Sequence, residues 1–132
     1  MLDHFGLNVR DLDRSVRFYE ACLLPLGLRV IERHDYGAVI IARSEAESVP
    51  FFWLGTARPS FWAAEHTAGR SPMHLCFTAP SRAAVDAFHA AALATGGTDN
   101  GAPGERSADD YGAYVLDPDG NNVEASLRGT GP

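Results

Sequence analysis

An internal duplication is the feature of this sequence that most limits its possible folds. A segment with His4 opens the first copy, and a segment with His74 opens the second, 70 positions later. The stretches Val16–Tyr19 and Val85–Phe88 repeat the pattern Val-x-x-aromatic 69 positions apart. Each half alone is small for a stable core. We therefore expect one domain over residues 1–132, with a first module at about 1–56 and a second at about 71–128.

Hydrophobic periodicity predicts the same order of elements in both halves. Alternating apolar residues predict strands, and apolar residues three or four positions apart predict one amphipathic helix in each half. The apolar stripe of the first helix is Leu12, Val16, Tyr19 and Leu23, and that of the second is Val85, Phe88 and Ala92. Asp11 and Ser81 are expected to cap the helices. The predicted strands cover residues 2–9, 28–33, 38–42, 49–54, 73–79, 111–116 and 123–127, with a weak one near 97–103. Each half is thus predicted to be β-α-β-β-β, which gives an α+β fold.

Two connecting segments have distinct compositions. Residues 99–110 are polar and rich in glycine and are expected to form a loop, and Asp117–Asn121 is expected to form the turn of a hairpin because it combines Pro, Gly and Asn. Residues 55–72, which join the modules, contain more aromatic and charged side chains than a plain linker needs.

The composition indicates a globular protein that binds neither nucleic acid nor membranes. The chain is 45% apolar and 21% charged, and 17 acidic residues outweigh 11 basic ones to give a net charge of -6. No run of Lys or Arg and no apolar stretch of membrane-spanning length is present. No basic region precedes an apolar stretch at the amino terminus, so a cytoplasmic location is expected. Cys22 and Cys76 lie in apolar patterns and are expected to be buried, unpaired thiols.

Three side chains could form a metal centre. His4 and His74 occupy equivalent positions of the duplicated strands, and Glu124 lies on a third strand. Two imidazoles and one carboxylate form a ligand set that divalent metals accept. A buried glutamate would also need a positive partner.

With these histidines, the helix start Asp11–Tyr19 and the sequence Asp117–Glu124, the chain resembles the vicinal oxygen chelate superfamily. This superfamily groups glyoxalase I, fosfomycin-modifying and bleomycin-binding proteins, and extradiol dioxygenases. The resemblance covers nearly the whole chain and implies that the two modules form a curved mixed sheet around a cleft. It places His4, His74 and Glu124 on three metal-ligand positions.

Two departures from the family patterns argue against a standard glyoxalase I and against a fosfomycin-modifying enzyme. The fourth ligand position falls within Phe51-Phe52-Trp53, where the usual glyoxalase I has a carboxylate or a glutamine. Gly6 stands where fosfomycin-modifying enzymes typically have a threonine.

The resemblance implies a metal-dependent enzyme that acts on a small oxygen-bearing substrate. Fe²⁺ or Mn²⁺ fits the ligand set best, with Zn²⁺ or Ni²⁺ as alternatives. Glu124 and Tyr114 are the expected catalytic residues, and ring-cleaving dioxygenation and glyoxalase-like isomerisation both fit. The expected substrate-binding residues are Phe52, Trp53, Trp62 and Arg70.

Two other functions stay open. One is a metal-free module that binds or sequesters a small molecule or drug, and the other is a chain that keeps only the fold. A homodimer is expected because resembling proteins commonly pair, and the site could then be built from one chain or two.

Overall fold

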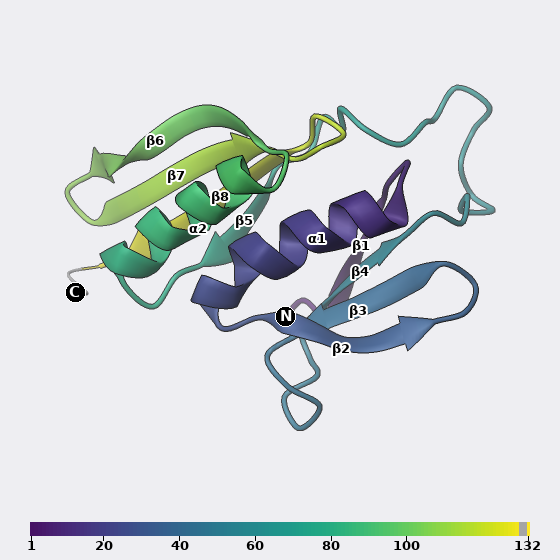
Figure 1. Ribbon diagram of the computed structural model, residues 1–132, viewed down its shortest axis with the longest axis horizontal. Helices are drawn as coiled ribbons and strands as arrows, with labels where there is room; N and C mark the ends of the chain where they lie inside the picture. Colours follow the sequence, from purple (N-terminus) through teal and green to yellow (C-terminus); the bar gives the residue numbers. More distant parts are fainter. Residues whose placement is uncertain (130–131) are drawn as a thin grey trace.

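The computed structural model describes residues 1–129 and 132, and its elements follow the predicted duplicated order (Figure 1). The first half contains β1 (His4–Asn8), α1 (Leu12–Leu23), a short 3-10 turn η1 (Leu24–Leu26), β2 (Arg29–His34), β3 (Ala38–Ala42) and β4 (Phe51–Gly55). The second half contains β5 (Leu75–Thr78), α2 (Arg82–Ala94), β6 (Thr98–Ser107), β7 (Asp110–Leu116) and β8 (Asn122–Arg128). The prediction of two β-α-β-β-β modules is confirmed. Residues 130–131 of the predicted domain lie outside the described part.

The strands form two mixed four-stranded sheets with the same topology. The order is β1-β4-β3-β2 in one sheet and β5-β8-β7-β6 in the other. In each sheet the first and last strands of the module pair in parallel, and the remaining pairs are antiparallel. The duplication in the sequence is therefore a duplication of the strand topology.

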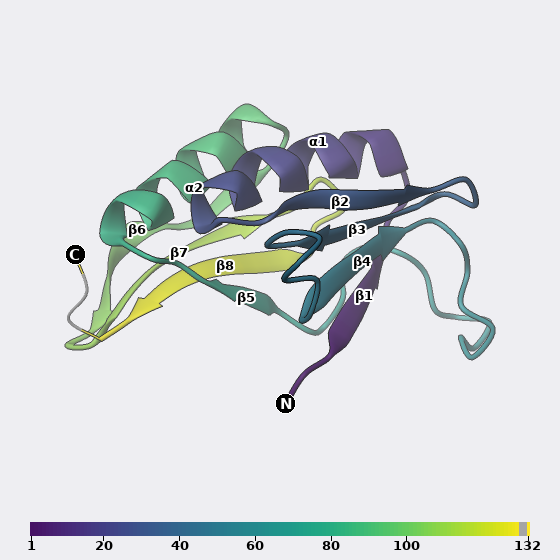
Figure 2. The ribbon, with the colours of Figure 1, turned by 90° about the horizontal axis from the view of Figure 1, so that it is seen from below.

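Both helices lie on the same side of the sheets, where they cover the core (Figure 2). Phe18 and Tyr19 of α1 and Val85 and Phe88 of α2 are fully buried there. The modules meet in this layer, because α1 contacts α2 and Phe77 of β5 lies 6.0 Å from Phe5 and 5.8 Å from Phe52, measured between ring centroids. The side of the sheets opposite the helices carries no helix (Figure 2).

Side-chain caps begin both helices, as predicted. The Asp11 carboxylate accepts a hydrogen bond from the amide of Arg14 at 3.0 Å, and the Ser81 hydroxyl accepts one from the amide of Ala84 at 3.1 Å. Each cap satisfies an amide that the first helical turn leaves without a backbone partner.

The predicted turn at Asp117–Asn121 also joins the modules. One oxygen of Asp117 accepts hydrogen bonds from the amides of Asp119 and Asn121, at 2.9 and 2.8 Å. Its other oxygen accepts a bond of 2.7 Å from the hydroxyl of Tyr19 in α1. Asp119 accepts a bond of 2.9 Å from the amide of Arg10. The turn of the second module is thus fixed against the helix of the first.

The segment expected to be a loop at 99–110 is instead mostly strand. β6 extends over Thr98–Ser107 and pairs with β7 through three shifts of register. Its Gly, Pro and Asn residues disfavour a strand, so local propensity pointed to a loop. The long antiparallel ladder to β7 outweighs that propensity.

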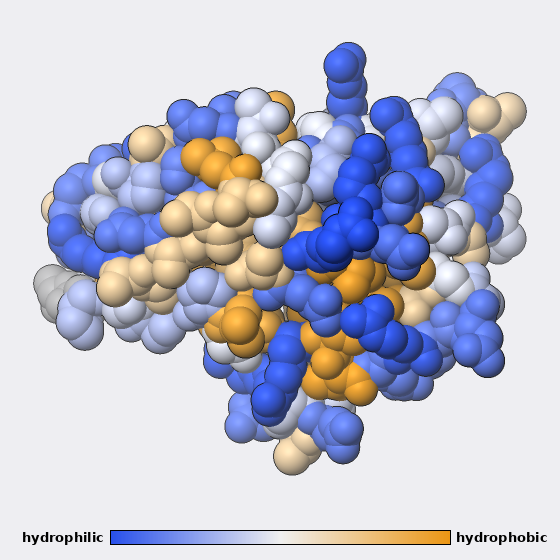
Figure 3. All heavy atoms as spheres, viewed as in Figure 1, coloured by the Kyte–Doolittle hydropathy of each residue, from blue (hydrophilic) through white to orange (hydrophobic). Residues whose placement is uncertain are grey.

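The surface is largely polar on the side of the helices. Figure 3 shows hydrophilic atoms over much of this face, with apolar atoms gathered over α2 and near the lower middle. In the described part of the chain, no helix has the length and apolar character needed to cross a bilayer.

Candidate functional site

The candidate site lies on the side of the sheets that the helices leave open. Side chains of a strand alternate between its two faces, so Phe5 and Leu7 point into the core while His4, Gly6 and Asn8 lie on the open side. Along β5 and the residue before it, the same alternation buries Leu75 and Phe77 and leaves His74 and Cys76 exposed.

Glu124 is the most unusual side chain on this open side. Its carboxylate is only 5% exposed, and Oε2 lies 3.4 Å from Nε2 of His74. Oε1 is buried without a hydrogen-bond partner among the described residues. Gly112 lies beside this atom, because a methyl group on Gly112 would lie 3.4 Å from Oε1. A buried carboxylate oxygen without a partner is costly, which makes it a candidate cation ligand.

His4 lies apart from this pair. Its Nδ1 is 2.6 Å from an oxygen of Asp3, and its ring stacks on Phe51 with centroids 4.6 Å apart. Within residues 1–129, no three His, Cys, Asp or Glu side chains stand close enough together to hold a metal ion. The structure therefore brings His74 and Glu124 together and leaves His4 outside, and the three-ligand centre stays a prediction.

Tyr114 and Cys76 are the direct neighbours of Glu124 on the flanking strands. Tyr114 of β7 and Cys76 of β5 are both in register with Glu124. Burial, and then the Glu124 carboxylate, raises the pKa of the Tyr114 hydroxyl above its usual value, so Tyr114 keeps its proton. The same two causes raise the pKa of the Cys76 thiol to about 12. The guanidinium of Arg106 lies 5.4 Å from the centre of the Tyr114 ring.

The sequence reasoning was wrong about Cys76 and missed Asp110. Cys76 is exposed, because it shares the open side of β5 with His74. Asp110 is 8% exposed and accepts a hydrogen bond of 2.7 Å from the hydroxyl of Ser126. The alternation Asp110, Gly112, Tyr114 along β7 is the signal that could have placed Asp110 on the same face as Tyr114.

A cavity lies on the open side of the first module. Its volume is about 620 Å³, and its lining includes His4, Tyr36, Ile40, Phe51, Trp53 and Phe61. Trp53 lines this cavity, and its role in substrate binding stays a prediction. A smaller cavity of about 210 Å³ lies between the modules and includes Phe52 and Cys76 in its walls.

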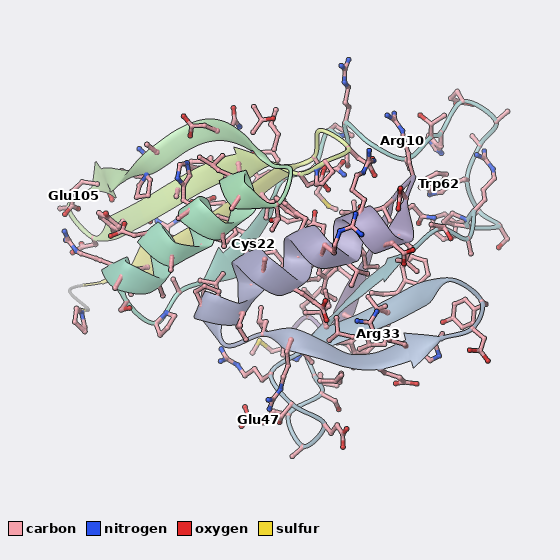
Figure 4. The ribbon with its side chains drawn as sticks, viewed as in Figure 1. Arg10, Cys22, Arg33, Glu47, Trp62 and Glu105 are labelled. Carbon is pink, nitrogen blue, oxygen red and sulfur yellow. The ribbon has the colours of Figure 1, made fainter. Side chains whose placement is uncertain are left out.

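Three predicted substrate-binding residues do not line the larger cavity. Phe52 is 2% exposed and packs in the core, because its neighbours Phe51 and Trp53 take the open side of β4. It reaches only the smaller cavity. Trp62 lies in the connecting segment beyond the ends of the strands (Figure 4), where Arg58 is 5.5 Å from its ring. Arg70 is exposed, and its side chain lies beside Gly120 of the β7–β8 turn.

Comparison with known proteins agrees with this fold. The sequence profile of the Glyoxalase/Bleomycin resistance protein/Dioxygenase superfamily matches residues 1–125. A glyoxalase/bleomycin resistance protein from Albidiferax ferrireducens is 32% identical, with a TM-score of 0.76 over 97% of this chain and 98% of that one. Lactoylglutathione lyase from Agrobacterium tumefaciens has the same fold at 21% identity, with a TM-score of 0.64 over 96% of this chain and 92% of that one. No curated protein matches the chain.

Two β-α-β-β-β modules with an open face on paired mixed sheets define a glyoxalase-type fold. The chain belongs to the Glyoxalase/Bleomycin resistance protein/Dioxygenase superfamily.

Proposed function

We propose that this chain is a divalent-metal-dependent enzyme that acts on a small oxygen-bearing substrate. The observation that carries the proposal is the environment of Glu124. Its carboxylate is almost fully buried, one oxygen faces His74 and the other has no hydrogen-bond partner among the described residues. Removing a carboxylate from water costs several kcal/mol unless a partner compensates, and His74 compensates only one side.

His74 and Glu124 would hold the metal, and His4 is the third proposed ligand because it occupies the position of His74 in the first module. The contact between Nδ1 of His4 and Asp3 supports this role. Histidines that bind metals commonly donate their other ring nitrogen to a carboxylate, which orients the ring. A bound Fe²⁺ or Mn²⁺, or alternatively Zn²⁺ or Ni²⁺, would polarise adjacent oxygens of the substrate.

The chain's own residues supply the proton chemistry. Tyr114 keeps its proton because burial and the neighbouring carboxylate raise its pKa, so its hydroxyl is available to donate a hydrogen bond to a substrate oxygen. Glu124 pairs with Tyr114 across the two strands, and its carboxylate is the candidate base. Tyr114 and Glu124 are thus the proposed catalytic residues.

The test is turnover of two substrate types by the protein purified without chelator. One is a catechol, followed by ring cleavage, and the other is the hemithioacetal of methylglyoxal and glutathione, followed by isomerisation. We expect one of them to be converted, the activity to be lost with EDTA and restored by Fe²⁺ or Mn²⁺, and His74→Ala and Glu124→Gln to lose at least 100-fold in kcat/KM. Activity that survives EDTA and both substitutions would refute the metal-dependent mechanism.

A metal-free binding module is the second candidate function, and the apolar cavity of the first module favours it. The cavity volume lies within the range of small-molecule sites, and aromatic side chains form much of its wall. Under this alternative, ligand affinity would be the same with and without metal, and no turnover would be found. A homodimer and a cytoplasmic location stay predictions.

A further inference from the structure

Trp53 packs closely against two glycines on the open side of the first sheet. A methyl group on Gly55 would lie 2.5 Å from both Cζ2 and Cη2 of Trp53, and a methyl group on Gly6 would lie 3.2 Å from Cε3. Real side chains essentially never approach as closely as 2.5 Å, so the six-membered ring occupies the space that a side chain at position 55 would need. The indole can therefore lie against the backbone of β1 and β4.

In this packed position, part of the indole faces the larger cavity. Trp53 is half-buried and lines the cavity of about 620 Å³, together with its cross-strand neighbour Ile40 and with Phe51. One side of the ring rests on the sheet, and the rest of it forms part of the cavity floor. Such a fixed aromatic surface favours offset stacking with a second ring.

The strand register shows that Trp53 occupies the position of Glu124 in the duplicated fold. Gly6 pairs with Trp53 between β1 and β4, as Cys76 pairs with Glu124 between β5 and β8. Ile40 of β3 pairs with Trp53, as Tyr114 of β7 pairs with Glu124. The second module thus presents a carboxylate where the first presents an indole.

The basic side chain at the rim of this cavity is already engaged. The guanidinium of Arg58 donates to the carbonyl oxygens of His66 and Ala63 and lies over the ring of Trp62. Both of these hydrogen bonds order the connecting segment. The floor and walls at Trp53, Ile40 and Phe51 carry no charge, so they suit an uncharged part of a ligand.

We propose that Trp53 is the stacking floor for an uncharged, planar aromatic ring, and that it selects such a ring over a saturated one of the same size. The proposal concerns binding alone. That the bound aromatic compound is the substrate rests on the proposed function, whereas the stacking itself requires no metal.

The test compares 2-naphthol with decahydro-2-naphthol, which carries the same hydroxyl on a saturated two-ring system of similar size. Calorimetry on the full chain in EDTA is expected to give at least about tenfold tighter binding of 2-naphthol, because stacking of a base on an aromatic side chain is worth about 1–3 kcal/mol and 1.4 kcal/mol is tenfold. Trp53→Leu should weaken 2-naphthol about tenfold and change decahydro-2-naphthol less than about twofold. Trp53→Phe, which keeps a ring, should recover part of the loss.

Two further variants locate the effect. Trp62→Leu, in the connecting segment, should leave both affinities unchanged. Gly55→Ala should reduce the affinity for 2-naphthol, because the added methyl group would displace the indole from its position against the sheet. Circular dichroism would verify that each variant is folded. Equal affinity for the two probes, absence of saturable 2-naphthol binding, or an unchanged affinity in folded Trp53→Leu would overturn the proposal.

Separate measurements of metal binding and of 2-naphthol affinity test the proposed function and the stacking proposal independently. Glu124→Gln should weaken metal binding at least tenfold and leave 2-naphthol affinity within about twofold of the unmodified protein. Stacking that persists in a protein unable to bind metal would refute the proposed function alone, and metal uptake without ring discrimination would refute the stacking floor alone.

Discussion

Glu124 and Trp53 occupy equivalent positions in the two modules, but their side chains differ in chemistry. Both lie on the strand that pairs in parallel with the first strand of their module, and both lie on the open side. Glu124 places a carboxylate in a buried position, and Trp53 places an aromatic ring at a cavity. The buried charge should weaken the folded state in the absence of a cation, because its desolvation is only partly compensated.

The substitution Glu124→Gln tests how much the desolvation of this carboxylate destabilises the folded state. In metal-free protein we expect the amide, which carries no charge, to raise the free energy of unfolding by about 1 kcal/mol or more. Urea denaturation would measure it. Glu105→Gln is the matched control, because Glu105 forms an ion pair with Arg82 and is half exposed (labelled in Figure 4), so its change should stay below about 1 kcal/mol. A loss of stability in Glu124→Gln as large as a cavity-forming core substitution would contradict the interpretation of Glu124 as an uncompensated charge.

At the scale of elements, the contact between α1 and the β7–β8 turn fixes one module on the other. The hydroxyl of Tyr19 is fully buried and donates to Asp117. Tyr19→Phe removes this donor and leaves part of the hydrogen-bonding capacity of a buried carboxylate unused. We expect the free energy of unfolding to fall by about 1–3 kcal/mol in urea denaturation.

Tyr111→Phe provides the control for that loss. Tyr111 also donates to an aspartate, Asp86, at 2.8 Å, but at an exposed position. Water replaces the lost bond there, so the change should stay within about 0.5 kcal/mol. Equal effects of the two substitutions would mean that the contact between α1 and the turn does not stabilise the fold.

The same contact predicts a dependence of stability on alkaline pH. Burial, and then the charge of Asp117, raises the pKa of the Tyr19 hydroxyl well above 10.0. The folded state therefore keeps the proton when the unfolded chain releases it, and this contribution to stability is full below pH 10 and is lost as the pH rises above 10. Unfolding measured from pH 8 to 11 should show the advantage of the unmodified protein over Tyr19→Phe shrinking above pH 10. A constant difference would exclude this linkage.

At the scale of the whole molecule, the sequence predicted the two-module architecture because apolar periodicity, helix caps and the Asp117–Asn121 turn are local signals. β6 was predicted only as a weak strand near 97–103, because its long ladder to β7 is a tertiary effect that its Gly and Pro residues conceal.

The site was predicted less completely because it depends on register. The face of each strand could be assigned from alternation, which places His4, His74 and Trp53 on the open side. Which residue of Phe51-Phe52-Trp53 corresponds to Glu124 depends on the pairing of β1 with β4, which only the three-dimensional structure gives. The same limit explains Phe52, assigned to the pocket although it belongs to the core.

The central claim is that Glu124 anchors a divalent metal on the open side of the second sheet. It is tested most directly by equilibrium Mn²⁺ binding, measured by electron paramagnetic resonance of the free ion, with the unmodified protein and Glu124→Gln. The account predicts one Mn²⁺ per chain in the unmodified protein and at least a tenfold loss of affinity in Glu124→Gln. Equal affinity in the two proteins, or no binding of Mn²⁺, Fe²⁺, Zn²⁺ or Ni²⁺ by either, would contradict it.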